Sequence, residues 1–272
     1  MPKAPFVVLV LWTAPSMAAP EGRAAHVDAN GVLIRGPESC GTRQEARPGA
    51  EDAAFIANPA TTVRTIYLNK NGGTYTIKTG GAVTNSATNT ANTQAAGDGS
   101  PHANAVIPPI DAVFNWPYIV ACVKTHYKPY NVSITETEPT SGDYVEAVVG
   151  GTGSSTGWSA SSGILGVAST DSFCGVDEKG IAFSFATNHI GIANQDDELC
   201  ATIAHEVGHL LALEHEIAGL DTMSYVPFAT SHTKSFTATD SPCGTDDQTR
   251  NNCMCQTTGS GQVTNSPSSP NR

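Results

Sequence analysis

The pattern of apolar and polar residues predicts a globular region that begins near residue 62 and is rich in strands. The segment TVRTIYLN at 62–69 consists largely of β-branched and aromatic residues. Similar short apolar runs recur at 130–137, 143–151, 163–169 and 180–187. Runs of this length, bounded by Gly, Asn, Pro or Ser, are typical of strands, so five strands are expected.

Two segments carry helical spacing instead. In 115–127, apolar residues recur at intervals of three and four, and Pro129 ends the pattern. A second helix is expected from about 197 to 211, with Asp196 or Asp197 as its N-terminal cap. The order of elements is therefore strand, helix, four strands, helix. This order predicts an α/β or α+β fold whose strands form a mostly local meander.

Two connecting segments suggest less regular structure. The sequence NKNGGTYTI, directly after 62–69, contains an Asn-Gly-Gly turn and could complete a hairpin. Residues 78–109 are rich in Gly, Asn, Thr and Ala without a core-forming pattern. Such a tract predicts a long surface loop or a disordered insertion.

The N-terminus has the pattern of a signal peptide. Lys3 precedes an apolar run from Phe6 to Trp12, and small residues at Ser16 and Ala18 form a cleavage site. The run is too short to span a bilayer, so a secreted, extracellular protein without a membrane anchor is expected. The predicted organisation is a signal peptide at 1–18, a propeptide-like leader at 19–58, one domain at 59–255 and a disordered polar tail at 256–272.

The net charge argues against nucleic-acid and membrane partners, and the cysteine content favours disulfides. The formal net charge is −11, with only 14 Lys and Arg residues. So acidic a chain has little attraction for nucleic acid or anionic membranes, and neither is expected as a partner. The seven cysteines of an exported protein favour disulfides, and their odd number leaves one thiol unpaired or paired with another chain.

The segment HEVGH at 205–209 predicts a metal site with a catalytic base. His205 and His209 are four residues apart, so both imidazoles leave the same face of a helix, as two ligands of one Zn²⁺ require. Glu206 lies about 100° around that helix and can reach a metal-bound water without being a ligand. The alternative is a pair of ordinary histidines on an amphipathic helix.

A catalytic zinc needs a third protein ligand and an open fourth position. Four residues that follow the helix are candidates: His215, Glu214, Glu216 and Asp221. On a straight helix His215 would lie about 15 Å along the axis from His205. It can bind only if the helix ends near Leu211 and the chain doubles back.

HEVGHLLALEH resembles the HExxHxxGxxH zinc motif of the metzincin metalloproteases, and DTMSY at 221–225 resembles their Met-turn, in the form seen in astacins and serralysins. The resemblance spans about residues 62–228. It implies a twisted mixed sheet of about five strands with a backing helix and an active-site helix. It also implies that His205, His209 and His215 bind one zinc, that Glu206 is the general base and that Met223 lies beneath the metal.

The same resemblance gives Tyr225 a role as a fifth ligand or as a hydrogen-bond donor to the transition state. A buried structural phenol is the alternative for Tyr225, and core packing is the alternative for Met223. One position departs from the family, because Ala212 replaces its glycine. Alanine in the left-handed conformation costs on the order of 1 kcal/mol, and zinc binding is worth many times that. A helix that ends by about Ala212 is therefore expected.

Cys40 is a candidate zymogen switch. The sequence ESCGTR around it is similar to the cysteine switch of pappalysin-like and matrixin-like zymogens, in which a propeptide thiolate fills the open zinc position. Without Cys40, six cysteines remain for three disulfides. The local guesses are Cys243 with Cys253 or Cys255, and Cys174 with Cys200. The alternative is that Cys40 is itself a disulfide partner.

These observations predict a secreted zinc endopeptidase, monomeric and made as a zymogen, that hydrolyses protein or peptide substrates. Its cleft would be lined by the loops at 78–109, 150–163 and 226–235. A structural Ca²⁺ would suit an acidic exported protease, but no ligand loop for it is recognisable. Two other functions remain open: a metzincin-like protein that binds zinc and peptide with little hydrolysis, and a disulfide-stabilised binding module.

Overall fold

The structure is a computed structural model that describes residues 63–78, 83–92, 95–169, 176–215, 220–224 and 234–236. It also describes the backbone of four short strands, which form two antiparallel pairs. These strands are β1 (His26–Val27), β2 (Leu33–Ile34), β11 (Ser241–Pro242) and β12 (Thr264–Asn265). The predicted signal peptide, Cys40, Tyr225 and most of the polar tail lie outside the described residues, as do the cysteines at 174, 243, 253 and 255.

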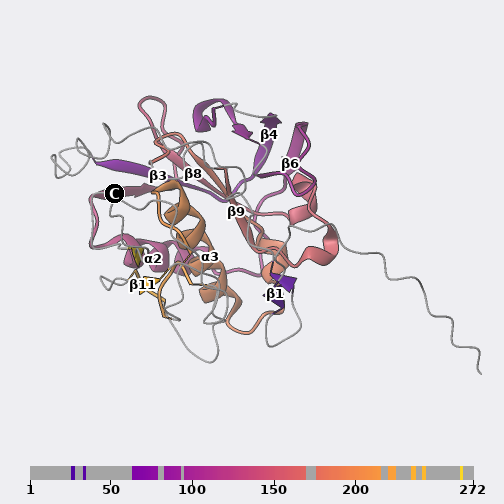
Figure 1. The fold of residues 1–272 in the computed structure, drawn as a ribbon. Coiled ribbons are helices and arrows are strands. Elements are labelled where there is room, and N and C mark those ends of the chain that lie inside the picture. Colours follow the sequence, from indigo (N-terminus) through magenta and orange to yellow (C-terminus); the bar gives the residue numbers. More distant parts are fainter. Residues whose placement is uncertain are drawn as a thin grey trace, which may run out of the picture.

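A mixed sheet of five strands forms the centre of the fold (Figure 1). Its order is β7 (Val132–Thr135), β3 (Arg64–Asn69), β8 (Val145–Val149), β10 (Ile181–Ser184) and β9 (Gly166–Ser169). Only β9 runs antiparallel to its neighbour, at one edge of the sheet. The five expected strands and the mixed sheet are confirmed. The expected local meander is wrong, because parallel neighbours must be joined by crossovers rather than tight turns.

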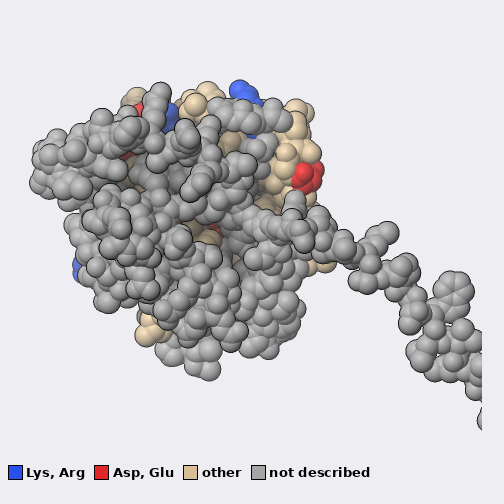
Figure 2. All heavy atoms as spheres, in the orientation of Figure 1, with Lys and Arg blue, Asp and Glu red and all other residues tan. Residues whose placement is uncertain are grey.

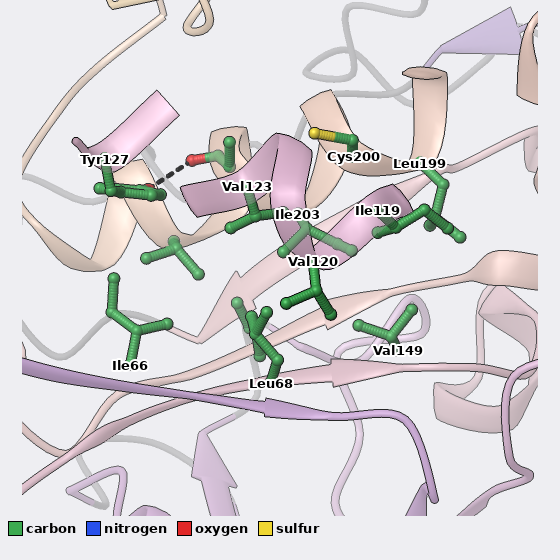
Figure 3. Close-up of a cluster of buried hydrophobic side chains, with 14 of the residues drawn as sticks. Ile66, Leu68, Ile119, Val120, Val123, Tyr127, Val149, Leu199, Cys200 and Ile203 are labelled. Carbon is green, nitrogen blue, oxygen red and sulfur yellow. Dashed lines mark hydrogen bonds between the residues drawn. The ribbon is translucent and has the colours of Figure 1, made fainter. Parts of the chain in front are cut away.

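Helices α2 (Trp116–Tyr127) and α3 (Gln195–Leu210) pack side by side on one face of this sheet. Asn115 caps α2 by accepting a hydrogen bond from the backbone N–H of Tyr118. Figure 3 shows the apolar side chains of both helices directed at those of β3 and β8. Tyr127 adds a buried hydrogen bond, since its hydroxyl donates to the carbonyl of Ala204, 2.7 Å away. The expected backing helix and second helix are thus both present.

The start of α3 differs from the prediction. The helix begins at Gln195, and its capping residue is Asn194, whose side chain makes no capping bond. Asp196 and Asp197 lie instead in the first turn, where the helix dipole stabilises negatively charged side chains. There they bind α2: Asp196 Oδ1 accepts from the Asn115 N–H at 3.1 Å, and the Tyr118 hydroxyl donates to Asp197. These acids therefore join the two helix starts.

A second sheet covers the opposite face of the central sheet. It consists of β5 (Thr90–Asn92), β4 (Gly73–Lys78) and β6 (His102–Ile107). Two expectations fail here: β4 does not form a hairpin with β3, and 78–109 is not a structureless loop. The reason lies in the core between the sheets, which combines small side chains such as Ala91 and Ala105 with Tyr75 and Phe183. Alanines that fill gaps between aromatic rings leave no clear apolar periodicity in the sequence.

Short 3-10 helices connect these elements. They are η1 (Ser86–Thr88), η3 (Gly153–Thr156), η4 (Ala160–Ser162) and η5 (Ala186–His189). None of the helices within the described ranges is long and apolar enough to cross a membrane. In the view of Figure 2, the described Lys and Arg side chains are scattered along the margins and do not gather into a patch.

A disulfide between Cys122 and Cys200 joins α2 to α3. The expected pairing of Cys174 with Cys200 is therefore wrong. Cys122 and Cys200 are 78 residues apart in the sequence, and only the packing of the two helices brings them together. Disulfides are typical of exported proteins, which agrees with the expected extracellular location.

Candidate metal centre

Helix α3 ends where a third ligand would require it to end. Its last residue is Leu210, and Ala212 adopts the left-handed conformation with φ of +66°. The N–H groups of Ala212 and Leu213 donate to the carbonyls of His209 and Gly208, each at 3.0 Å. This pair of bonds is the Schellman motif, which normally places glycine at the left-handed position. The expectation of a helix that ends by about Ala212 is confirmed.

The turn brings His215 back to the two histidines of the helix. The Nε2 atom of His209 lies 3.1 Å from Nε2 of His205 and 2.8 Å from Nε2 of His215. Three nitrogens bound tetrahedrally to one Zn²⁺ would lie about 3.3 Å apart, given Zn–N distances of about 2.0–2.1 Å. Among the described acidic and histidine side chains, only His215 completes a possible metal group with His205 and His209.

Backbone carbonyls fix the tautomers of two of these histidines. His205 Nδ1 donates to the carbonyl of Thr222 and His209 Nδ1 donates to that of Leu213, both at 2.8 Å. Burial lowers the pKa of His209 to about 4 and that of His205 well below its usual range, so both rings are neutral near pH 7. Their Nε2 atoms then carry lone pairs that point at each other. A cation between them would remove this repulsion, so the three residues fit a metal ion.

Glu206 follows His205 on α3, and its side chain fills a space that a glycine leaves open. A Cβ atom at Gly166, on the edge strand β9, would lie 2.6 Å from Cγ and 2.7 Å from Oε1 of Glu206. The carboxyl group is buried, and its Oε2 atom has no hydrogen-bond partner. Burial raises the pKa of Glu206 to about 8. A nearby cation or a substrate group would satisfy this carboxyl group better than the protein does.

The turn at 221–224 packs against α3, the helix that carries His205 and His209. Met223 is fully buried, and a Cβ atom at Gly208 would lie 2.5 Å from its Sδ atom. Gly208 stands between His205 and His209, so Met223 packs against the part of α3 that carries the two histidines. Asp221 holds the turn, since its Oδ1 accepts from the Met223 N–H at 2.7 Å. That bond gives Asp221 a structural role, in contrast to its candidacy as a ligand.

Glu214 is half-buried near the turn and is not part of the possible metal group. Glu216, Tyr225 and Cys40 lie outside the described residues, so their suggested roles stay predictions. No sequence pattern pointed to Thr222, whose carbonyl accepts from His205, or to Gly166. None pointed to His126, which hydrogen-bonds the Thr222 hydroxyl. Each of these contacts joins segments that are distant in the sequence.

Comparison with protein-family models, with curated proteins and with solved structures found no match. The site must therefore be interpreted from its own chemistry. It contains one buried and two half-buried histidines, all neutral, whose nitrogens converge, and an unsatisfied carboxyl group on the neighbouring residue Glu206. This arrangement could hold a metal ion such as zinc.

Proposed function

We propose that this protein is a secreted zinc endopeptidase of the metzincin type, in which His205, His209 and His215 bind one zinc. The observation that carries the proposal is the position of Glu206. A buried carboxyl group with a free Oε2 is costly, and carboxyl groups with strongly shifted pKa values are enriched at functional sites. Here it belongs to the residue that follows His205, on the helix that carries two of the three possible metal ligands.

Bound zinc would supply a polarised scissile carbonyl and a water of lowered pKa. Glu206 would accept the proton of that water and deliver it to the leaving amide nitrogen. Proximity to a cation would favour the ionised carboxylate that the first proton transfer needs. Gly166 would keep the carboxyl group in place, because any side chain on β9 at this point would displace it.

Export and activation complete the proposal. The signal-peptide pattern and the Cys122–Cys200 disulfide support a secreted protein. Cys40, in the leader at 19–58, would keep the precursor inactive through its thiolate, and removal of the leader would activate it. A Cys40→Ala precursor should then be active without processing. If that variant is as inactive as the wild-type precursor, the switch does not exist.

The main test compares wild-type protein with Glu206→Gln, each without its leader. Casein cleavage and zinc content are measured for both. We expect one zinc in each protein and cleavage by the wild type only. Equal cleavage by both proteins would refute the mechanism. One zinc with no cleavage by either protein would favour a zinc- and peptide-binding protein, and no zinc in either would favour a binding module with incidental histidines.

A further inference from the structure

Two residues of α2, one turn apart, contact α3 and the turn at 221–224. Cys122 is bonded to Cys200 of α3, and His126 hydrogen-bonds Thr222 in the turn beneath the cluster. Residues four apart lie on the same face of a helix, so a single face of α2 makes both contacts. The disulfide joins α2 to α3, and the His126 ring joins α2 to the turn at 221–224.

Thr222 also contacts His205, one of the three proposed metal ligands. Its hydroxyl lies 2.9 Å from Nδ1 of His126, and its carbonyl accepts from Nδ1 of His205 at 2.8 Å. Its own N–H donates to the carbonyl of Ser235 at 3.1 Å, so the backbone of Thr222 is held from both sides. A continuous chain of hydrogen bonds therefore runs from His126 through Thr222 to His205.

The His126 ring is itself fixed by its surroundings. It is 5% exposed and meets the Phe236 ring edge-on, with centroids 6.1 Å apart. Phe236 in turn packs against Tyr127, the next residue of α2. A ring clamped in this way presents Nδ1 to Thr222 in one orientation.

We propose that His126 is a positioning residue for the metal, acting through Thr222 to hold His205 in its metal-binding tautomer and orientation. The proposal rests on the proposed function, because it assumes that the histidine cluster binds zinc. Partners that orient a metal-ligating histidine commonly change metal affinity by about 10- to 100-fold when removed. His126 acts one residue further out, so an effect of about 10-fold is expected.

His126 also lies with Cys122 and Cys200 in a second possible metal group. Their sulfur atoms are bonded to each other, and a disulfide offers no thiolate to a metal. The experiment is therefore carried out on oxidised protein, where a second zinc is not expected and would itself contradict the role assigned to His126.

The test measures the zinc dissociation constant by competition with a chelator. His126→Phe keeps an aromatic ring but removes the hydrogen bond, and Thr222→Val removes the hydroxyl while keeping the shape and the carbonyl. His126→Asn returns a polar group near the position of Nδ1. We expect zinc binding about 10-fold weaker in the first two variants and largely restored in the third. The melting temperature of the metal-free protein is measured alongside, because a purely structural role would change only that.

His189→Phe is the matched control. His189 is also buried, and its Nε2 lies 2.9 Å from the hydroxyl of Thr202 on α3, whereas His126 contacts the residue whose carbonyl binds His205. This variant should lose stability without losing zinc affinity. The proposal fails if His126→Phe and Thr222→Val bind zinc as tightly as wild type, or if His189→Phe weakens binding equally. Absence of zinc from the wild type would overturn the proposed function as well, so the two failures are distinguishable.

Discussion

Glu146 and Glu206 are buried on opposite sides of the five-stranded sheet, and their surroundings differ in kind. Glu146 faces the second sheet, where its Oε1 accepts from the Tyr75 hydroxyl at 2.8 Å and from Asn69 Nδ2 at 2.9 Å. Glu206 is the neighbour of His205 on α3, its carboxyl group packs against Gly166 of β9, and burial alone raises its pKa, to about 8. The first carboxyl group is held by donors from the protein, whereas the second adjoins residues that are suited to hold a cation.

Burial by itself does not identify a catalytic carboxyl group. Burial also raises the pKa of Glu146, to about 7, although the hydrogen bonds from Asn69 and Tyr75 act in the opposite direction. Both residues therefore have strongly shifted pKa values and a free Oε2 atom. What separates them is the adjacent chemistry: a tyrosine and an amide for Glu146, and three converging imidazoles for Glu206.

The largest expected effect comes from exchanging each carboxyl group for an amide. Glu206→Gln should lower kcat for peptide hydrolysis by about 10²- to 10⁴-fold, the usual contribution of general acid–base catalysis. Glu146→Gln should leave kcat unchanged, because that residue lies on the other face of the sheet. Steady-state cleavage of a fluorogenic peptide measures both. A comparable loss in the two variants would remove the functional distinction between them.

Gly166→Ala tests the space that Glu206 occupies. The added Cβ atom would lie 2.7 Å from Oε1, so the carboxyl group must move. A displacement of about 1 Å in a catalytic group can lower the rate about 100-fold, and a loss of about that size is expected in kcat. Zinc content should stay at one per chain, because no ligand is touched. Loss of zinc together with activity would instead place Gly166 in the support of the metal site.

The pH dependence of stability should report on Glu146. Its pKa is raised from 4.5 to about 7 on folding, so its favourable contribution is fully present below pH 4.5 and is lost as the pH rises through 7. The free energy of unfolding should fall by on the order of 3 kcal/mol across this window. Urea unfolding at several pH values measures it.

Glu146→Gln is the comparison for that experiment, because glutamine does not titrate. The difference between the two stability profiles isolates this residue from all other groups. A difference that does not change between pH 4.5 and 7 would mean that Glu146 stays ionised in the folded protein.

The smallest expected effect concerns the turn that completes the histidine cluster. Ala212→Gly should raise the free energy of unfolding by about 1 kcal/mol or less, because glycine accepts the positive φ of this position without strain. Ala201→Gly, within α3, is the control and should destabilise by about 1 kcal/mol. Thermal unfolding measures both. Equal destabilisation by the two substitutions would show that Ala212 is not strained.

The five strands of the central sheet, the two long helices and the ligand pair were predictable from local sequence. The strands were predictable because their apolar runs are local, and His205 with His209 was predictable because four-residue spacing fixes one helix face. The end of α3 was expected through the family resemblance, whereas the local preference of Leu210 to Glu214 favours a continued helix. The Schellman bonds from Ala212 and Leu213 outweigh that preference in the fold.

The contacts between distant residues around the histidine cluster were not predictable from the sequence and depend on the tertiary structure. The pairing of Cys122 with Cys200, the packing of Gly166 against Glu206 and the chain from His126 to His205 all depend on how elements pack. The second sheet also depends on tertiary packing, because its alanines pack in one core with aromatic rings from other strands. Periodicity records which face of an element is buried. It does not record what lies against that face, because those contacts form between residues far apart in the chain.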